Sequence, residues 1–193
     1  MYLAPGPNGH DNGSFEFSGT SDSYVEFTNS AYGALDVRYS ITLLCWIYYD
    51  GQDGPLFHYG IGESGIWALA FWVWQGTPSV AIFSRDYGFI QETHSVTYLA
   101  GEWKLVGVSY DHMSGELKLW IDGFVDTTAY IGVGFELATQ VGVRMGAILN
   151  DGRYFRGRIT QVRVYNVALT QEQIQEIRGK NVRHKRYSPF LIS

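Results

Sequence analysis

The chain has 193 residues, of which 16% are aromatic and 17% charged, and its formal net charge is −5 at pH 7. A chain of this length is expected to form one domain with a buried core, and its acidic balance argues against nucleic acid or an anionic membrane surface as a partner. The apolar run at residues 66–74 is far shorter than the roughly 20 residues of a membrane-spanning helix, so we expect no membrane insertion.

Alternating apolar and polar residues predict a series of short β-strands. In chain order these are residues 14–17, 24–27, 41–49, 55–60, 66–74, 79–86, 91–99, 103–111, 116–122, 140–149 and 154–166. The turn sequence HMSG predicts an antiparallel hairpin between 103–111 and 116–122, because its glycine tolerates a positive φ. Asn150-Asp151-Gly152 predicts a second hairpin between the last two strands.

One helix is expected near the C-terminus, in the sequence LTQEQIQEIRG. Thr170 and Gln173 form a capping-box pattern at its start, and Arg178 followed by Gly179 marks its end. About a dozen short strands and one small helix indicate an all-β sandwich. We divide the chain into an N-terminal extension (1–13), a β-domain (14–179) and a basic tail or linker (180–193).

Three stretches resemble the laminin-G-like, concanavalin-A-like jelly-roll family. FEFSGTSDSYVEF (15–27) is similar to the family's opening hairpin, and WKLVGVSYDHMSGELKLWIDG (103–123) to its central hairpin. FRGRITQVRVYNVALTQEQI (155–174) resembles its closing strand and helix. The resemblance implies an antiparallel jelly-roll sandwich of two sheets, one of them concave, and it covers nearly all of residues 14–179.

The stretch GIWALAFWVW (65–74) holds three of the six tryptophans. Alternate residues of a strand face opposite sides, so we assign one set to the core and the other to the concave outer surface. The core set is Trp67, Leu69, Phe71 and Val73, and the outer set is Ile66, Ala68, Ala70, Trp72 and Trp74. Two exposed indoles form an apolar patch of the size that marks an interaction site.

Aromatic planes flanked by a few polar groups suit sugar rings, which stack through their C–H faces and hydrogen-bond through their hydroxyls. We predict that Trp72, Trp74 and Trp120 form an apolar platform on a common outward face, and that Arg85 and Lys118 orient the ligand. Two alternatives remain open at this stage. Loops or the N-terminal segment cover the indoles, or the indoles contact another protein.

Catalytic chemistry has little support in the sequence. GIGESG (60–65) is followed by an expected strand, whereas a dinucleotide-binding loop requires a helix. Glucanases of the same superfamily need two carboxylates that flank one glycosidic bond, and no predicted strand carries two acids on one face. The five histidines show no zinc-ligand spacing. We therefore expect no enzyme, and a glucanase-like hydrolase is the least favoured function.

The resemblance also implies a structural calcium ion between the opening hairpin and an Asp-Glu pair in the closing strand. This chain keeps Asp22 in GTSDSY but has Thr160-Gln161 at the position of the pair, which removes the negative charge. Calcium prefers six to eight oxygen ligands, so Asp22 is the one side chain that we name as a metal ligand. The alternative is an ordinary turn aspartate.

Signals of location are short but agree with the resemblance. Asn12-Gly13-Ser14 is an N-glycosylation sequon, and the RHKR sequence at 183–186 has the form of a secretory processing site. The single cysteine, Cys45, is expected to be buried and inert. We predict a non-catalytic extracellular binding or adhesion module, secreted or part of an ectodomain, that recognises a carbohydrate or a partner protein. The alternative is a structural sandwich that mediates protein–protein contacts and binds no sugar.

Overall fold

The structure is a computed structural model that describes residues 2–60, 67–99 and 101–183. Within these ranges the chain forms thirteen strands and one helix. The elements are β1 (Tyr2–Ala4), β2 (Ser14–Ser18), β3 (Val25–Phe27), β4 (Ile41–Gln52), β5 (Gly54–Tyr59), β6 (Ala70–Trp74), β7 (Thr77–Phe83), β8 (Phe89–His94), β9 (Trp103–Tyr110), β10 (Glu116–Ile121), β11 (Phe124–Tyr130), β12 (Val143–Met145), β13 (Arg156–Tyr165) and α1 (Gln171–Arg183). No helix in these ranges has the length and apolar character that a membrane crossing requires.

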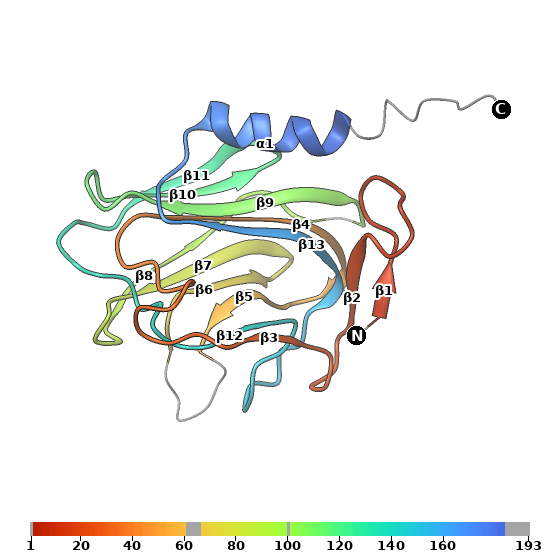
Figure 1. The fold of residues 1–193 in the computed structure, drawn as a ribbon, viewed down its shortest axis with the longest axis horizontal. Helices are drawn as coiled ribbons and strands as arrows, with labels where there is room; N and C mark the ends of the chain where they lie inside the picture. The colour runs from red at the N-terminus through yellow and green to blue at the C-terminus, as the bar shows by residue number, and fades with distance from the viewer. Residues whose placement is uncertain (1, 61–66, 100, 184–193) are drawn as a thin grey trace.

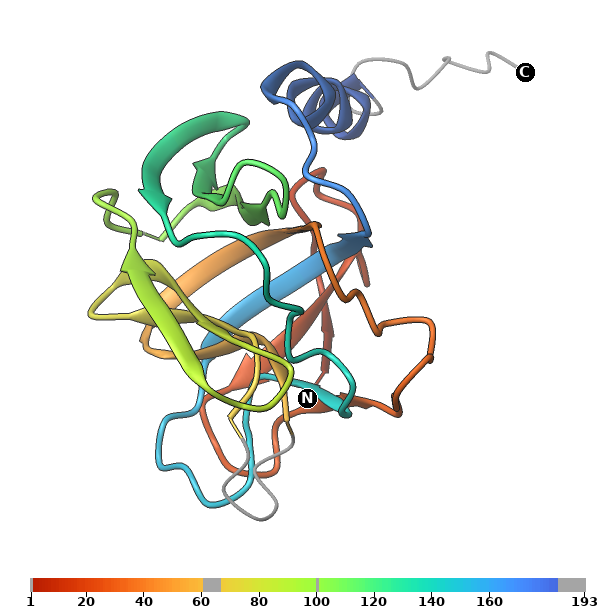
Figure 2. The ribbon, with the colours of Figure 1, turned by 90° about the vertical axis from the view of Figure 1, so that its left-hand side faces the viewer.

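The strands form two sheets packed face to face (Figures 1 and 2). The seven-stranded sheet has the order β1-β2-β13-β4-β9-β10-β11, and the six-stranded sheet has the order β3-β12-β5-β6-β7-β8. The strand pairings of both sheets are antiparallel. Helix α1 lies over the outer face of the seven-stranded sheet (Figure 1). The predicted all-β antiparallel jelly-roll sandwich with one short C-terminal helix is confirmed.

The main hydrophobic core fills the space between the sheets, and β4 shows how the sequence builds it. The inward side chains of β4 belong to the central cluster, and its outward side chains belong to a second cluster beneath α1. The inward set is Ile41, Leu43, Cys45 and Ile47, and the outward set is Leu44 and Trp46. Cys45 is buried, and burial raises the pKa of its thiol. The cysteine is therefore unreactive, as predicted.

The β9–β10 hairpin and the start of α1 follow the local sequence signals. Leu117 pairs with Tyr110 across the hairpin, and Gly115 takes the expected positive φ of 75°. At the helix, the Thr170 N–H donates to Gln173 Oε1 at 2.9 Å and the Gln173 N–H donates to Thr170 Oγ1 at 3.4 Å. Both the hairpin and the capping box are confirmed, because each depends on residues close together in the chain.

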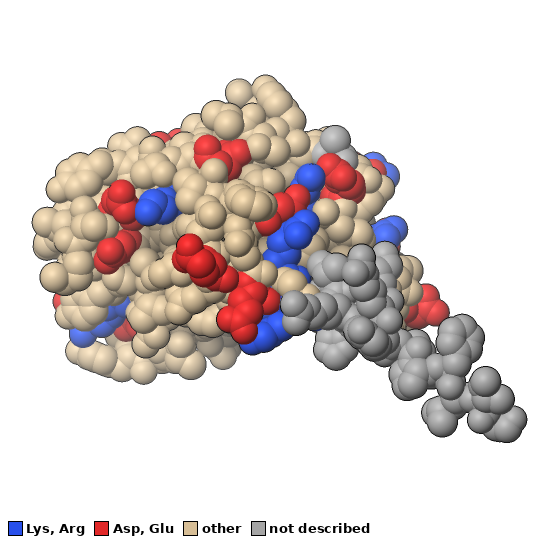
Figure 3. Space-filling view, turned by 90° about the horizontal axis from the view of Figure 1, so that it is seen from above, with Lys and Arg blue, Asp and Glu red and all other residues tan. Residues whose placement is uncertain are grey.

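The predicted end of the helix is wrong, because α1 continues through Gly179 to Arg183. Asp122, in the β10–β11 turn, links α1 to β9, because its carboxylate lies 3.6 Å from Arg178 of α1 and 3.2 Å from Lys104 of β9. Seen from the side of α1, acidic and basic side chains lie next to one another (Figure 3). This face of the molecule therefore presents charges of both signs.

The predicted second hairpin is also wrong. β12 belongs to the six-stranded sheet and β13 to the seven-stranded sheet, so residues 146–155 cross from one sheet to the other. Gly146 starts this crossing with a φ of 86°, and its carbonyl accepts the Phe155 N–H at 2.8 Å. Asn150-Asp151-Gly152 does turn the chain, but a turn signal does not specify which strands the turn joins. β1 and β11 were not predicted, and β1 draws part of the N-terminal extension into the sheet.

Candidate functional site

The β6–β7 hairpin sets the position of the tryptophans. Gln75 and Gly76 form its turn with φ values of 50° and 74°, and the Asp53 carboxylate accepts the Gly76 N–H at 3.1 Å. Along β6, Phe71 and Val73 point into the main core. Ala70 and Trp72 belong instead to a small cluster with Ile148 on the outer face. The predicted alternation is therefore confirmed within β6.

The alternation fails before β6. Because the strand begins at Ala70, the preceding residues do not follow its pleat. Ala68, assigned to the outer face, is in the main core, and Trp67, assigned to the core, is 40% exposed. The Trp67 ring lies 6.4 Å from the Trp72 ring, measured between centroids. The predictions for both residues are wrong, and Ile66 lies outside the described residues.

Trp72 is covered rather than open. It is 5% exposed, and its Nε1–H donates to Nδ1 of the buried His58 at 2.9 Å. Burial lowers the pKa of His58 to about 3, so its imidazole is neutral at physiological pH and, with Nδ1 accepting, carries its proton on Nε2. The prediction that Trp72 is an exposed indole is wrong. Trp74 is half-buried and keeps part of its ring accessible.

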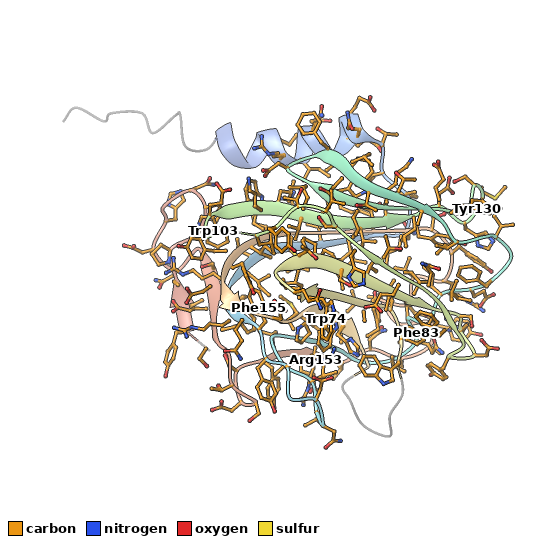
Figure 4. The ribbon with its side chains drawn as sticks, turned by 180° about the vertical axis from the view of Figure 1, so that it is seen from behind. Trp74, Phe83, Trp103, Tyr130, Arg153 and Phe155 are labelled. Carbon is orange, nitrogen blue, oxygen red and sulfur yellow. The ribbon has the colours of Figure 1, made fainter. Side chains whose placement is uncertain are left out.

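Arg153 covers Trp72. Its guanidinium carbon lies 4.3 Å from the Trp72 ring centroid, 5.0 Å from that of Trp74 and 5.9 Å from that of Trp67, all within cation–π range. Figure 4 shows Trp74 and Arg153 side by side, away from α1. Arg153 Nε also donates to Asp151 Oδ1 at 2.8 Å, and this hydrogen bond is the main cause of the lowered pKa of Asp151.

These residues surround a small hollow on the outer face of the six-stranded sheet. Its volume is about 50 Å³, and its lining is Trp67, Ala70, Trp72, Trp74, Ser79, Ala81, Glu92 and Arg153. A single water needs roughly 10–15 Å³ of this kind of volume, so the hollow holds only a few waters and is too small to enclose a sugar ring. A ligand would rest across its mouth, against the accessible parts of Trp67 and Trp74. We refer to these eight residues as the tryptophan hollow.

Trp120 and Lys118 lie on the other side of the molecule, because β10 belongs to the seven-stranded sheet. Trp120 is 3% exposed beneath α1, and its Nε1–H donates to Ser109 Oγ at 2.8 Å. Lys118 pairs with Glu116 at 2.8 Å. The prediction that Trp120 and Lys118 share an outward face with the tryptophans of β6 is therefore wrong. Alternation along a strand gives the face on which a residue lies, but not the sheet to which the strand belongs.

The outer face of the seven-stranded sheet carries two larger hollows. One, of about 320 Å³, includes Trp120 and Lys118 together with residues 168–171. The other, of about 330 Å³, is lined mainly by polar side chains of β2, β4 and β13, and its Arg156 pairs with Asp50 at 3.1 Å. Neither of these two hollows brings several aromatic faces together. We therefore take the tryptophan hollow as the candidate site.

Arg85 has structural partners. Its Nη1 and Nη2 donate to the two carboxylate oxygens of Asp36, each at 2.8 Å, and its Nε lies 3.6 Å from Glu136. The hydrogen bonds from Arg85 are the largest cause of the lowered pKa of Asp36, which is about 2. The predicted role of Arg85 beside the indoles is wrong, because this arginine links the loop before β4 to the segment after β11.

Asp22 lies at an exposed turn after β2. Its exposed carboxylate accepts a hydrogen bond from Thr20 Oγ1 at 2.6 Å, and the Thr160 hydroxyl donates to the Gly13 carbonyl. In the part of the chain that the structure describes, no three His, Cys, Asp or Glu side chains come close enough to hold a metal ion. Calcium binding at Asp22 stays a prediction from the resemblance, and no function is derived from it.

Comparisons with known proteins agree with this fold. A family profile described as the concanavalin A-like lectin/glucanases superfamily, of the laminin G type, matches residues 18–175. A heptameric SAP-like pentraxin from Limulus polyphemus has a TM-score of 0.63 and 16% identity, with 84% of this chain and 80% of the pentraxin covered. No curated protein sequence is significantly similar to this chain.

Two further solved structures are carbohydrate-binding by their descriptions. The CBM40 module of the Ruminococcus gnavus IT-sialidase, bound to α2,3-sialyllactose, has a TM-score of 0.67 and 16% identity, with 86% of this chain and 96% of the module covered. A candidate carbohydrate-binding protein from Bacteroides ovatus has a TM-score of 0.64 and 17% identity, with 84% of this chain and 47% of that protein covered. At these identities the likeness concerns the fold.

Proposed function

The chain belongs to the concanavalin A-like lectin/glucanase superfamily, and on that premise we propose that it is a non-catalytic module that binds a carbohydrate at the tryptophan hollow. The observation that carries the proposal is the grouping of three indoles around one guanidinium on an outer sheet face. Similar folds with carbohydrate-binding descriptions support it. Sugar rings would stack on Trp67 and Trp74, the two indoles that keep accessible surface.

Polar groups at the rim suit the hydroxyls of a sugar. Asp151 occupies Nε and one N–H of Nη2 on Arg153, and a guanidinium has five N–H donors in all. Glu92, on β8, offers carboxylate oxygens at the same hollow, next to Ser79. Aromatic surface with a few polar groups around it is the usual composition of a small-molecule site.

The electrostatics of the site favour binding over hydrolysis. A glycosidase needs two carboxyl groups across one bond, and one of them acts as an acid through a raised pKa. At the tryptophan hollow, the hydrogen bond from Arg153 instead lowers the pKa of Asp151. Asp151 therefore remains an anion that holds Arg153 in place, which supports a positioning role rather than an acid role.

We also propose that the module acts outside the cell, as a secreted protein or part of an ectodomain. Asn12, the acceptor of the sequon, is exposed and has a φ of 61°. The Ser14 side chain of the same sequon is buried and donates to the Ala4 carbonyl at 3.0 Å. The last three residues of the RHKR sequence lie outside the described residues, so processing there stays a prediction.

A glycan array with the wild type, Trp67→Ala and Trp74→Ala tests the proposed site. We expect the wild type to bind a set of related glycans and each variant to bind them at least tenfold more weakly, because each loses a stacking surface. Tyr130→Ala is a matched control: Tyr130 is 73% exposed on β11 of the other sheet, and its loss should leave binding unchanged.

Two outcomes would contradict the proposal. Equal binding by the wild type and both tryptophan variants would place the sugar site elsewhere. A silent array combined with capture of a protein partner would favour the structural, protein-binding alternative.

A further inference from the structure

Negative charges outnumber positive charges at the tryptophan hollow. This difference affects which carbohydrates the proposed site accepts. Asp151 takes the fork of Arg153, with Oδ1 accepting from Nε at 2.8 Å and Oδ2 accepting from Nη2 at 2.5 Å. Such a bidentate pair is the arrangement by which arginine recognises a carboxylate. In this protein the carboxylate of Asp151 already forms that bidentate pair with Arg153.

Glu92 adds a second carboxylate to the same hollow. Its side chain is 49% exposed, and its negative charge is among the smaller causes that raise the pKa of Arg153, after the hydrogen bond to Asp151. The lining and its support thus contain one guanidinium and two carboxylates. The site has a net negative charge, in spite of the arginine at its centre.

Neighbouring groups on this outer face do not reverse that balance. Arg144, which pairs with His58 between β12 and β5, is 6% exposed and donates through Nε to Glu26 at 2.6 Å. His58 is neutral because burial lowers its pKa to about 3. His94 lies 3.9 Å from Glu92 and is not among the residues that line the hollow.

We infer that the tryptophan hollow selects uncharged glycans and discriminates against glycans that carry a carboxylate or a sulfate. An acidic group placed over Trp67 or Trp74 would approach Glu92 and would compete with Asp151 for the fork of Arg153. The hydroxyls of a neutral sugar meet no such penalty, because a hydroxyl donates to Glu92 or accepts from Arg153 as required. The inference rests on the proposed function and specifies its ligand class.

The test uses pairs of array glycans that differ in one acidic group, such as N-acetyllactosamine and its 6-sulfate, or a β-glucoside and the corresponding β-glucuronide. We expect the wild type at pH 7.4 and low ionic strength to bind the neutral member of each recognised pair at least tenfold more tightly. Because Coulombic repulsion is screened by salt, the ratio should shrink toward one as sodium chloride is raised to 0.5 M.

Glu92→Gln removes one negative charge from the site and should reduce the discrimination at least threefold. Glu116→Gln is the matched control, because Glu116 has a similar side-chain exposure of 46% and lies on β10 of the other sheet. The control should keep the wild-type ratio. Asp151→Asn, which frees the fork of Arg153, should reduce the discrimination further.

The outcomes separate the inference from the function on which it rests. Equal or tighter binding of the acidic members by the wild type would overturn the inference and leave carbohydrate binding in place. An unchanged ratio in Glu92→Gln would also overturn it, because the discrimination would then have another source. Failure to bind any member of any pair would overturn the proposed function itself.

Discussion

Each sheet of the sandwich carries tryptophans on its outer face, and the two faces differ in what covers them. On the seven-stranded sheet, Trp46 and Trp120 lie beneath α1 and are 5% and 3% exposed. On the six-stranded sheet, Trp72 is 5% exposed beneath Arg153, while Trp67 remains 40% exposed. The same residue type on equivalent faces thus gives a second core on one side and a candidate binding site on the other.

The chemistry of the covering element explains the difference. Helix α1 brings an apolar side chain, the fully buried Ile174, onto its tryptophans and excludes water from them. The loop after β12 instead brings Arg153, a planar cation held by Asp151. A guanidinium stacks on indole rings and still keeps polar edges toward water, so this face is covered at its centre and remains open and polar at its rim.

The largest loss of stability should come from Trp120→Ala. We expect a loss of about 3–5 kcal/mol in the free energy of unfolding, because truncation leaves a cavity under α1 and removes the hydrogen bond to Ser109. Urea denaturation followed by circular dichroism measures it. The milder Trp120→Phe should lose less and remain folded. A loss below 1 kcal/mol for Trp120→Ala would mean that α1 does not seal this cluster.

A smaller effect, on the pH dependence of the free energy of unfolding, should distinguish the buried hydrogen-bond partners of the two indoles. Trp120 donates to Ser109, which does not titrate, whereas Trp72 donates to His58. The pKa of His58 is about 3 in the folded protein and near 6.5 in the unfolded chain. Between these pH values the unfolded chain binds a proton that the folded protein does not. The contribution of His58 to stability is therefore complete above pH 6.5 and falls on acidification by about 1.4 kcal/mol per pH unit.

His58→Gln should remove this dependence, because an amide oxygen still accepts from Trp72 but does not titrate. The measurement is the free energy of unfolding in urea at pH 7, 6, 5 and 4. His94→Gln is the control, because it makes the same substitution at a histidine whose side chain is 44% exposed and which lies on β8. This variant should lose stability on acidification as the wild type does. An equal slope in the wild type and in His58→Gln would show that His58 is not the group that titrates.

The sequence predicts those parts of the molecule that depend on neighbours in the chain. The alternation of β4, the β9–β10 hairpin and the Thr170 capping box each need a few consecutive residues, and all are confirmed. The resemblance of three segments adds the two-sheet architecture. These signals fix which face of a strand a side chain occupies, as for Phe71 and Trp72.

The candidate site depends on contacts between distant segments, and sequence patterns do not specify these. Trp72 and Trp120 have the same outward parity, but the pairing of β10 with β9 puts Trp120 in the other sheet. The contact of Arg153 with Trp72 joins residues 81 positions apart, by the difference of their numbers. The one local signal for it, Asn150-Asp151-Gly152, predicts a turn, and the structure shows that this turn carries Arg153 over the indoles rather than closing a hairpin.

The smallest stability effect should come from Trp67→Ala, the counterpart of Trp120→Ala on the open face. Its indole borders solvent, so truncation leaves a notch that water fills rather than an internal cavity, and we expect a loss of about 1–2 kcal/mol. The same urea titration measures it, with Trp120→Ala as the reference. If the two truncations cost the same, Trp67 is a core residue of its face, as its assignment from strand alternation implied. A small loss of stability together with a large loss of glycan binding would instead show that its surface is kept for a ligand, since packing alone would then not account for an indole at this position.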